Sequence, residues 1–295
     1  MRRLLCALAA TFVLQAAWAA SPLVFQSDFG TRDSAVASMK GVAVSVSEDL
    51  SIYDLTHEIP PYNIWEGSLR LVQAAEYWPE GTVFVSVVDP GVGTERKSIV
   101  MRSKSGHFFV TPDNGTLTFI AEELGVDEVR EIDEAVNRLA NSEESYTFHG
   151  RDVYSYTGAR LAAGIIGFEE VGRKLPGRVV SIPYQKAVLE GGTLKGNIPI
   201  LDVQYGNVWT NIDRKSFSKL GIEPGGMVEV LIRNGDEEIY QGMLPYHPTF
   251  GYVEVGEPLL YLNSLNNVSL AINQGNFAEE HNIQSGASWN IEITK

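Results

Sequence analysis

Cysteine is nearly missing from this sequence, and its scarcity restricts the chemistry open to the chain. Only Cys6 is a cysteine among 295 residues, so a disulfide within the chain is excluded. Histidine is also sparse, and its positions lack the paired spacing of a metal site: they are His57, His107, His149, His247 and His281. We therefore expect no metal and no cofactor.

Positive charge is in short supply as well. The chain has 23 lysine and arginine residues against 37 aspartate and glutamate residues, which gives a formal net charge of −14. Such a chain repels nucleic acid phosphates and anionic lipid unless a local basic patch overrides the average, and the sequence has no such patch. A nucleic acid partner is therefore not expected.

Hydrophobic runs long enough to cross a membrane are absent too. The apolar run at 4–13 is too short for a spanning helix, and it follows an arginine pair. Small residues at Ala17 and Ala19 then complete the pattern of a cleavable export signal over residues 1–20. A buried N-terminal helix is the alternative, but it leaves the arginines unexplained. We expect a periplasmic or secreted protein that is free of the membrane after cleavage and has lost Cys6.

One stretch of the mature chain combines a buried strand with a polar loop. Five of the six residues at 83–88 are apolar, which is typical of a strand covered on both faces. Proline and glycines end the strand at once, placing Asp89 at its carboxyl end, the edge of an α/β sheet where ligands usually bind. Arg96 follows seven residues later. The pair indicates either a functional site or an ordinary strand-loop ion pair.

The order of the other elements predicts an α/β fold. Short apolar strands alternate with amphipathic patterns, which is typical of a mostly parallel sheet with helices on both faces, an α/β sandwich. From residue 191 onward, short β-rich runs separated by glycine-bearing turns indicate an antiparallel barrel or sandwich. We expect an N-terminal α/β domain at 21–180 and a C-terminal β domain at 190–295, with the boundary between 175 and 192.

Several loops together resemble one protein family. The motifs are Ser-Asp-Phe-Gly at 27–30, Met-Lys-Gly at 39–41, Asp-Pro-Gly-Val-Gly at 89–93 with Arg96, Pro-Asp-Asn-Gly at 112–115, Phe-His-Gly-Arg-Asp at 148–152 and Tyr-Gly-Asn-Val-Trp-Thr-Asn-Ile at 205–212. In this order they resemble the S-adenosyl-L-methionine (SAM) hydrolases, also called SAM hydroxide adenosyltransferases. These are relatives of the bacterial fluorinase and chlorinase. The resemblance covers essentially the whole mature chain.

The resemblance implies a fold, an assembly and an activity. It implies that the C-terminal domain is a β-barrel and that three copies form a homotrimer, with SAM bound between the N-terminal domain of one subunit and the C-terminal domain of its neighbour. It implies hydrolysis of SAM to adenosine and L-methionine by water activated by Asp89, Arg96 and His149. Halogenating relatives replace the aspartate of this loop by an aromatic residue and lack the histidine. From the residues alone, a loop histidine is more often structural.

The resemblance also implies substrate-binding residues. Asp28 corresponds to the acid that holds the ribose hydroxyls, with a helix N-cap as the alternative. Tyr62 corresponds to an aromatic residue beside the sugar or adenine, with core packing as the alternative. Asp202 and Asn207 correspond to residues that hold the methionine ammonium. Ser264 corresponds to a donor to the methionine carboxylate, and Asn273 to a residue at the adenine edge. Ordinary turn chemistry is the alternative for several of these short polar residues.

Three functional classes follow from the sequence. The first is a SAM hydrolase, and the second is an exported protein that binds an adenosyl compound or nucleoside without turnover. The third is a structural protein that reuses the trimer. A reaction chromatogram separates the first two, and ligand-induced thermal stabilisation identifies the third by its absence.

Overall fold

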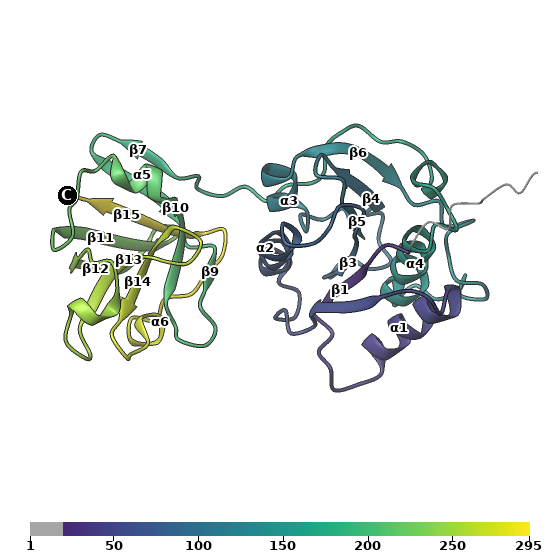
Figure 1. Cartoon of the computed structure of the whole chain (residues 1–295), viewed down its shortest axis with the longest axis horizontal. Coiled ribbons are helices and arrows are strands. Elements are labelled where there is room, and N and C mark those ends of the chain that lie inside the picture. The colour runs from purple at the N-terminus through teal and green to yellow at the C-terminus, as the bar shows by residue number, and fades with distance from the viewer. Residues whose placement is uncertain (1–19) are drawn as a thin grey trace, which may run out of the picture.

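The computed structural model describes residues 20–295, and it has two lobes joined by an extended segment (Figure 1). The export signal predicted at 1–20, with Cys6, falls almost wholly in residues 1–19, outside the described part, so export stays a prediction. No helix of the described residues is long and apolar enough to cross a membrane.

The N-terminal lobe is built on a six-stranded mixed sheet with the order β2-β1-β3-β5-β4-β6. Its first four strands in that order run parallel, while β4 is antiparallel to both neighbours. The strands are β1 (Leu23–Ser27), β2 (Ile52–Thr56), β3 (Val83–Val87), β4 (Ser98–Ser103), β5 (Phe108–Pro112) and β6 (Val126–Glu131). The predicted mostly parallel α/β sheet is thus present, with an antiparallel edge.

Helices cover both faces of this sheet because the strands carry apolar side chains on both sides. One core packs the sheet against α1 (Ala35–Val46), the π-helical turn η1 (Gly150–Ser155) and α4 (Tyr156–Ala162). The other packs it against α2 (Ile64–Ala75) and α3 (Thr118–Glu123). Asn63 caps α2 as its sequence predicts, since its Oδ1 accepts a hydrogen bond from the backbone N–H of Glu66 at 3.0 Å. A short 3₁₀ helix, η2 (Phe168–Val171), follows.

The C-terminal lobe consists of two antiparallel sheets over one core. The first has the order β13-β14-β10-β9 and the second β12-β11-β15-β8-β7. Their strands are β7 (Val188–Glu190), β8 (Thr193–Asn197), β9 (Ile200–Leu201), β10 (Val208–Asp213), β11 (Met227–Asn234), β12 (Glu237–Pro245), β13 (Pro258–Leu262), β14 (Asn267–Ile272) and β15 (Trp289–Thr294). The short helices are α5 (Arg214–Ser218), η3 (Phe250–Tyr252) and α6 (Phe277–Glu280). Within the described residues no ladder joins the two sheets, and only an isolated bridge between Tyr246 and Leu260 connects them, so the predicted closed barrel is not confirmed.

The lobes contact one another through α2 and the start of the second lobe. Trp65 Nε1 donates a hydrogen bond to the Pro199 carbonyl oxygen at 2.8 Å. Ile200 and Trp209 pack into the same core as α2 and α3, on the side of the N-terminal lobe that faces the second lobe in Figure 1. Asp28 and Asp89, which follow the carboxyl ends of β1 and β3, line a pocket whose other lining residues also belong to the N-terminal lobe.

Candidate active site

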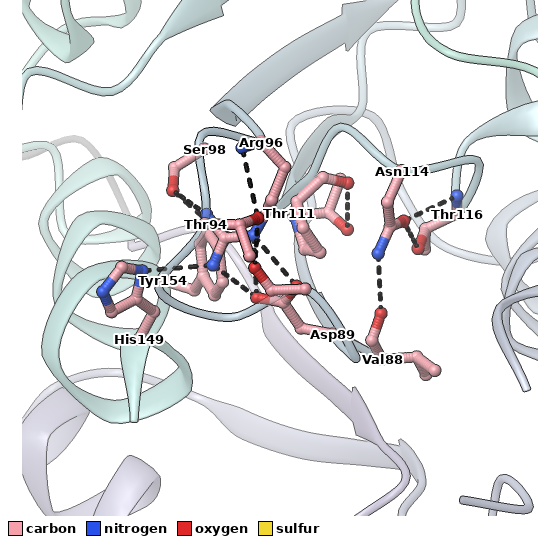
Figure 2. A network of polar contacts seen from close by, with 12 residues as sticks. Val88, Asp89, Thr94, Arg96, Ser98, Thr111, Asn114, Thr116, His149 and Tyr154 are labelled. Carbon is pink, nitrogen blue, oxygen red and sulfur yellow. Dashed lines mark hydrogen bonds and ion pairs between the residues drawn. The ribbon is translucent and has the colours of Figure 1, made fainter. Parts of the chain in front are cut away.

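A buried ion pair lies at the carboxyl end of β3. Asp89 accepts hydrogen bonds from Arg96 Nε at 2.9 Å and from Arg96 Nη2 at 2.5 Å, one to each carboxylate oxygen (Figure 2). Side-chain exposure is 5% for Asp89 and 11% for Arg96. A bidentate pair this well shielded from water holds the carboxylate in one orientation.

His149 lies on the other side of Arg96. Its Nδ1 is 3.1 Å from Arg96 Nη2, so the guanidinium stands between the imidazole and the Asp89 carboxylate (Figure 2). The described residues include no hydrogen bond between His149 and Asp89. The Asp89 carboxylate can therefore favour an imidazolium through its charge, which raises the pKa of His149, but not through a direct hydrogen bond, because the arginine occupies the position that such a contact needs.

A second arginine, which the sequence motifs did not indicate, covers the remaining nitrogen of His149. Arg138 Nη2 lies 3.3 Å from His149 Nε2, and this arginine nitrogen also forms an ion pair with the Glu134 carboxylate. Arg138 Nη1 donates to the carbonyl oxygens of Ser142 and Ser145 at 3.1 and 3.3 Å. Arg138 thus ties the loop before the histidine to the imidazole. It belongs to no motif and stands 11 residues before His149, so only the folded chain reveals it.

The surroundings disfavour a charged imidazole. Burial lowers the pKa of His149 below its usual value of 6.5, the carboxylates of Glu134 and Asp89 oppose this shift, and the guanidinium groups of Arg96 and Arg138 add to it. A neutral imidazole has one acceptor nitrogen, whereas both of its nitrogens here face N–H donors. The ring can therefore accept from one arginine at a time.

Local backbone features bring the histidine loop to the strand ends. A Cβ on Gly93 would lie 2.8 Å from the Tyr146 carbonyl oxygen, and Gly93 has φ +76°, so this position requires glycine. A Cβ on Gly150 would lie 3.2 Å from the Phe29 ring, which allows η1 to pack against the end of β1. The glycines of two motifs thus serve close packing.

Tyr154 and Ser98 complete the environment of Arg96. Ser98 Oγ accepts from Arg96 Nη1 at 3.1 Å and lies 3.1 Å from the Tyr154 hydroxyl. Burial raises the pKa of Tyr154 well above its usual range, despite the nearby charge of Arg96. Tyr154 therefore acts as a neutral support for the guanidinium.

Asp28 and Tyr62 meet Asp89 at a small pocket. The Tyr62 backbone N–H donates to Asp28 Oδ2 at 2.8 Å. A pocket of about 220 Å³ is lined by Asp28, Phe29, Pro61, Tyr62 and Asp89. Tyr62 is 73% exposed, which contradicts core packing. The helices α1 and α2 have Ser34 and Asn63 at their N-caps, which contradicts the cap alternative for Asp28. The pocket thus has two carboxylates on its wall.

The predicted residues of the C-terminal lobe lie away from this pocket, and only Asp202 and Asn207 contact one another. Asn207 Nδ2 donates to Asp202 Oδ2 at 3.2 Å. Ser264 is exposed in the turn after β13, whereas Asn273 follows the far end of β14 and donates through Nδ2 to the Val253 carbonyl at 2.9 Å. None of these four predicted residues lines the pocket that Asp28 and Asp89 share.

Other hollows lack the predicted catalytic residues. A pocket of about 490 Å³ lies between α2, α3 and β10, and its lining includes none of the predicted site residues. Asp202 lines a third hollow, of about 560 Å³, together with Pro60 and Glu66 of the first lobe. No group of three or more potential metal ligands occurs among the described residues.

Comparison with known proteins places this site in context. The model for the SAM hydroxide adenosyltransferase N-terminal domain matches residues 23–172, and the model for the C-terminal domain of the same name matches residues 196–290. An (R)-S-adenosyl-L-methionine hydrolase from Methanocaldococcus jannaschii is 36% identical over 221 residues, covering 74% of this chain and 76% of that protein.

A fluorinase from Actinopolyspora mzabensis is also similar, with 31% identity over 298 residues, 92% of this chain and 97% of that protein. Among solved structures, an uncharacterized conserved protein from Thermotoga maritima is 36% identical and superposes with a TM-score of 0.82. That match covers 92% of this chain and 100% of the other.

Proposed function

This chain belongs to the SAM hydroxide adenosyltransferase family, and we propose that it is an enzyme that hydrolyses SAM to adenosine and L-methionine. The observation that carries the proposal is the Asp89 carboxylate, which Arg96 holds in a bidentate pair at the wall of the pocket that also contains Asp28. A ribose held by Asp28 would present its C5′ side to the groups around Asp89.

The reaction needs help only for the nucleophile. The water oxygen forms a bond to ribose C5′ while the C5′–S bond breaks, and its electron pair stays on sulfur, which leaves as a neutral thioether. The water loses its proton to the Asp89 carboxylate, the acceptor that faces the pocket. Arg96 fixes that carboxylate, and His149 fixes Arg96 from behind. Asp89 is thus the catalytic residue of this proposal, with Arg96 and His149 as its positioning residues.

The same geometry favours water over halide. Relatives named for both reactions are similar to this chain, so similarity alone does not choose between them. A carboxylate at the nucleophile position repels a halide, whereas it accepts a hydrogen bond from water. The retained Asp89 and His149 match the hydrolase pattern of the resemblance.

We propose that a second copy of the chain completes the substrate site. The pocket at Asp28 and Asp89 is small, and the predicted methionine and adenine residues of the same chain do not line it. In the homotrimer that the resemblance implies, Asp202, Asn207, Ser264 and Asn273 of one subunit would face Asp28 and Tyr62 of the next. The exported location of the chain belongs to the same proposal and follows from the signal pattern at 1–20.

Incubating the purified mature protein with each sulfonium epimer of SAM, followed by chromatography of the products, tests the proposal. Curated relatives are named for the (R) epimer, so both are supplied separately. Release of adenosine and methionine in equal amounts is the expected result. SAM binding without turnover would replace hydrolysis by the alternative, an exported adenosyl- or nucleoside-binding protein. The absence of both binding and turnover would support a structural role.

A further inference from the structure

A second hydrogen-bond network of polar side chains begins at Ser27, next to Asp28 in sequence, and is separate from the Asp89–Arg96–His149 cluster. Ser27 Oγ is 2.7 Å from His57 Nδ1, and His57 Nε2 is 3.0 Å from Asp54 Oδ1. Lys40 Nζ donates to the other Asp54 oxygen at 2.6 Å. The network extends from the partly exposed Lys40 and Asp54 to the buried end of β1, where Ser27 and His57 are 0% and 3% exposed.

Each hydrogen bond of this network can be given a donor and an acceptor without conflict. Burial raises the pKa of Asp54, but hydrogen bonds from Lys40 and His57 outweigh burial and the net shift is downward, so the carboxylate accepts from both. In the tautomer whose Nε2–H donates to Asp54, Nδ1 accepts a hydrogen bond from the Ser27 hydroxyl. Ser27 Oγ in turn accepts from the Phe29 backbone N–H at 3.3 Å.

These bonds hold the loop that carries Asp28. Ser27 and Phe29 flank Asp28 in sequence, and both take part in this hydrogen-bond network. The backbone N–H of Gly30 donates to the His57 carbonyl oxygen at 2.7 Å, and Asp28 itself accepts from Tyr62 N–H. The loops that follow β1 and β2 are therefore joined on both sides of Asp28 as well as through it.

The residue types resemble those of a nucleophilic Ser-His-Asp set, but the geometry contradicts that role. A nucleophilic serine must reach its substrate, whereas Ser27 is fully buried and does not line the neighbouring pocket. Its oxygen also accepts from the Phe29 N–H. The set is suited to holding a loop.

We propose that Ser27, His57 and Asp54, anchored by Lys40, are positioning residues that preorganise Asp28 for binding the substrate ribose. The inference rests on the proposed function through the role of Asp28. Restricting the loop before binding lowers the conformational entropy lost when the ligand arrives, so the contribution belongs to affinity. The rate of the bound complex depends on the separate Asp89 cluster.

A double-mutant cycle on SAM affinity tests this inference. We expect Ser27→Ala to weaken calorimetric SAM binding about tenfold, the equivalent of one lost hydrogen bond, with kcat at saturation unchanged within about twofold. In an Asp28→Ala background the same change should have no further effect, because the serine acts through Asp28. An equal loss of affinity in both backgrounds would overturn the proposal.

Ser105→Ala is the matched control. Ser105 Oγ lies 2.8 Å from His107 Nδ1, which is a second Ser–His contact. It lies in the turn between β4 and β5, at the end of the sheet where the parallel strands begin, whereas Asp28 follows the end where they finish. We expect this variant to bind SAM like the wild type. A similar loss in Ser105→Ala would show that any broken Ser–His bond produces the effect, which would also overturn the proposal.

Hydrogen exchange of the Tyr62 amide separates this inference from the proposed function. That amide donates to Asp28 in the free protein, so its protection requires no ligand. We expect faster exchange in Ser27→Ala than in the wild type or Ser105→Ala. If the wild type neither binds nor cleaves SAM, the proposed function fails. The exchange result still decides whether Ser27, His57 and Asp54 position the Asp28 loop. Unchanged Tyr62 protection in Ser27→Ala would overturn it.

Discussion

Arg138 Nη2 lies 3.3 Å from His149 Nε2, on the side of the ring opposite Arg96. The histidine is thus held between two guanidinium groups, which makes it a poor proton acceptor in this arrangement. It is better suited to setting the orientation of Arg96.

Replacing Arg138 should change the pH dependence of the reaction. Loss of its charge in Arg138→Leu removes one of the causes that lower the pKa of His149, so this pKa rises. We expect the acid limb of kcat/KM to move to higher pH. Arg138→Lys keeps a positive charge and is the control. Identical profiles for wild type and Arg138→Leu would show that protonation of His149 does not govern the rate.

The pKa of His149 also predicts how stability depends on pH. Because its folded-state value lies below 6.5, the unfolded chain binds this proton first as pH falls. This histidine should therefore destabilise the fold progressively as pH falls from about 6.5 toward its folded-state pKa. Denaturant unfolding from pH 8 to 5 measures the effect against His149→Gln, which should show a smaller decline.

Asp89→Asn should abolish most turnover while leaving substrate binding nearly intact. A positioned base contributes roughly 10²–10⁴-fold, so single-turnover adenosine release should slow by that factor with SAM affinity within a few-fold. His149→Ala in the same background should add little, because the residues act as one unit. Asp127→Asn, which breaks the more exposed pair with Arg102, is the control. Loss of binding in place of rate would contradict the assignment.

Asn207→Ala should behave in the opposite way. If Asn207 and Asp202 hold the methionine ammonium, the substitution removes a ground-state contact and affinity falls roughly tenfold to a hundredfold. Calorimetric titration with SAM and with adenosine distinguishes the methionine end from the nucleoside end. Equal losses for both ligands would place Asn207 elsewhere in the site.

Chloride should not replace water as the nucleophile. The Asp89 carboxylate repels an anion at the pocket wall, so 5′-chloro-5′-deoxyadenosine should be absent from reactions at high chloride. Mass spectrometry of the products provides the measurement, with a chlorinase as the positive control. Detection of the chlorinated nucleoside would move this chain to the halogenating branch.

The sequence alone determined the layered architecture and the two acids at the strand ends. Apolar runs such as 83–88 are buried on both faces wherever a parallel sheet forms, so the strand and its exit at Asp89 followed from local pattern. Asn63 likewise starts α2 through a bond to a backbone N–H three residues away. Such features depend on near neighbours in the chain.

Only the tertiary structure decided which groups touch. Arg138 reaches His149 across a loop, and Ser27 reaches His57 from the adjacent strand, 30 residues away in sequence. Side-chain contacts of this kind depend on how loops pack, which no local periodicity specifies. The placement of Arg96 between Asp89 and His149 has the same origin, and it is the contact on which the proposed role of Asp89 rests, because a guanidinium donates to both neighbours and accepts from neither.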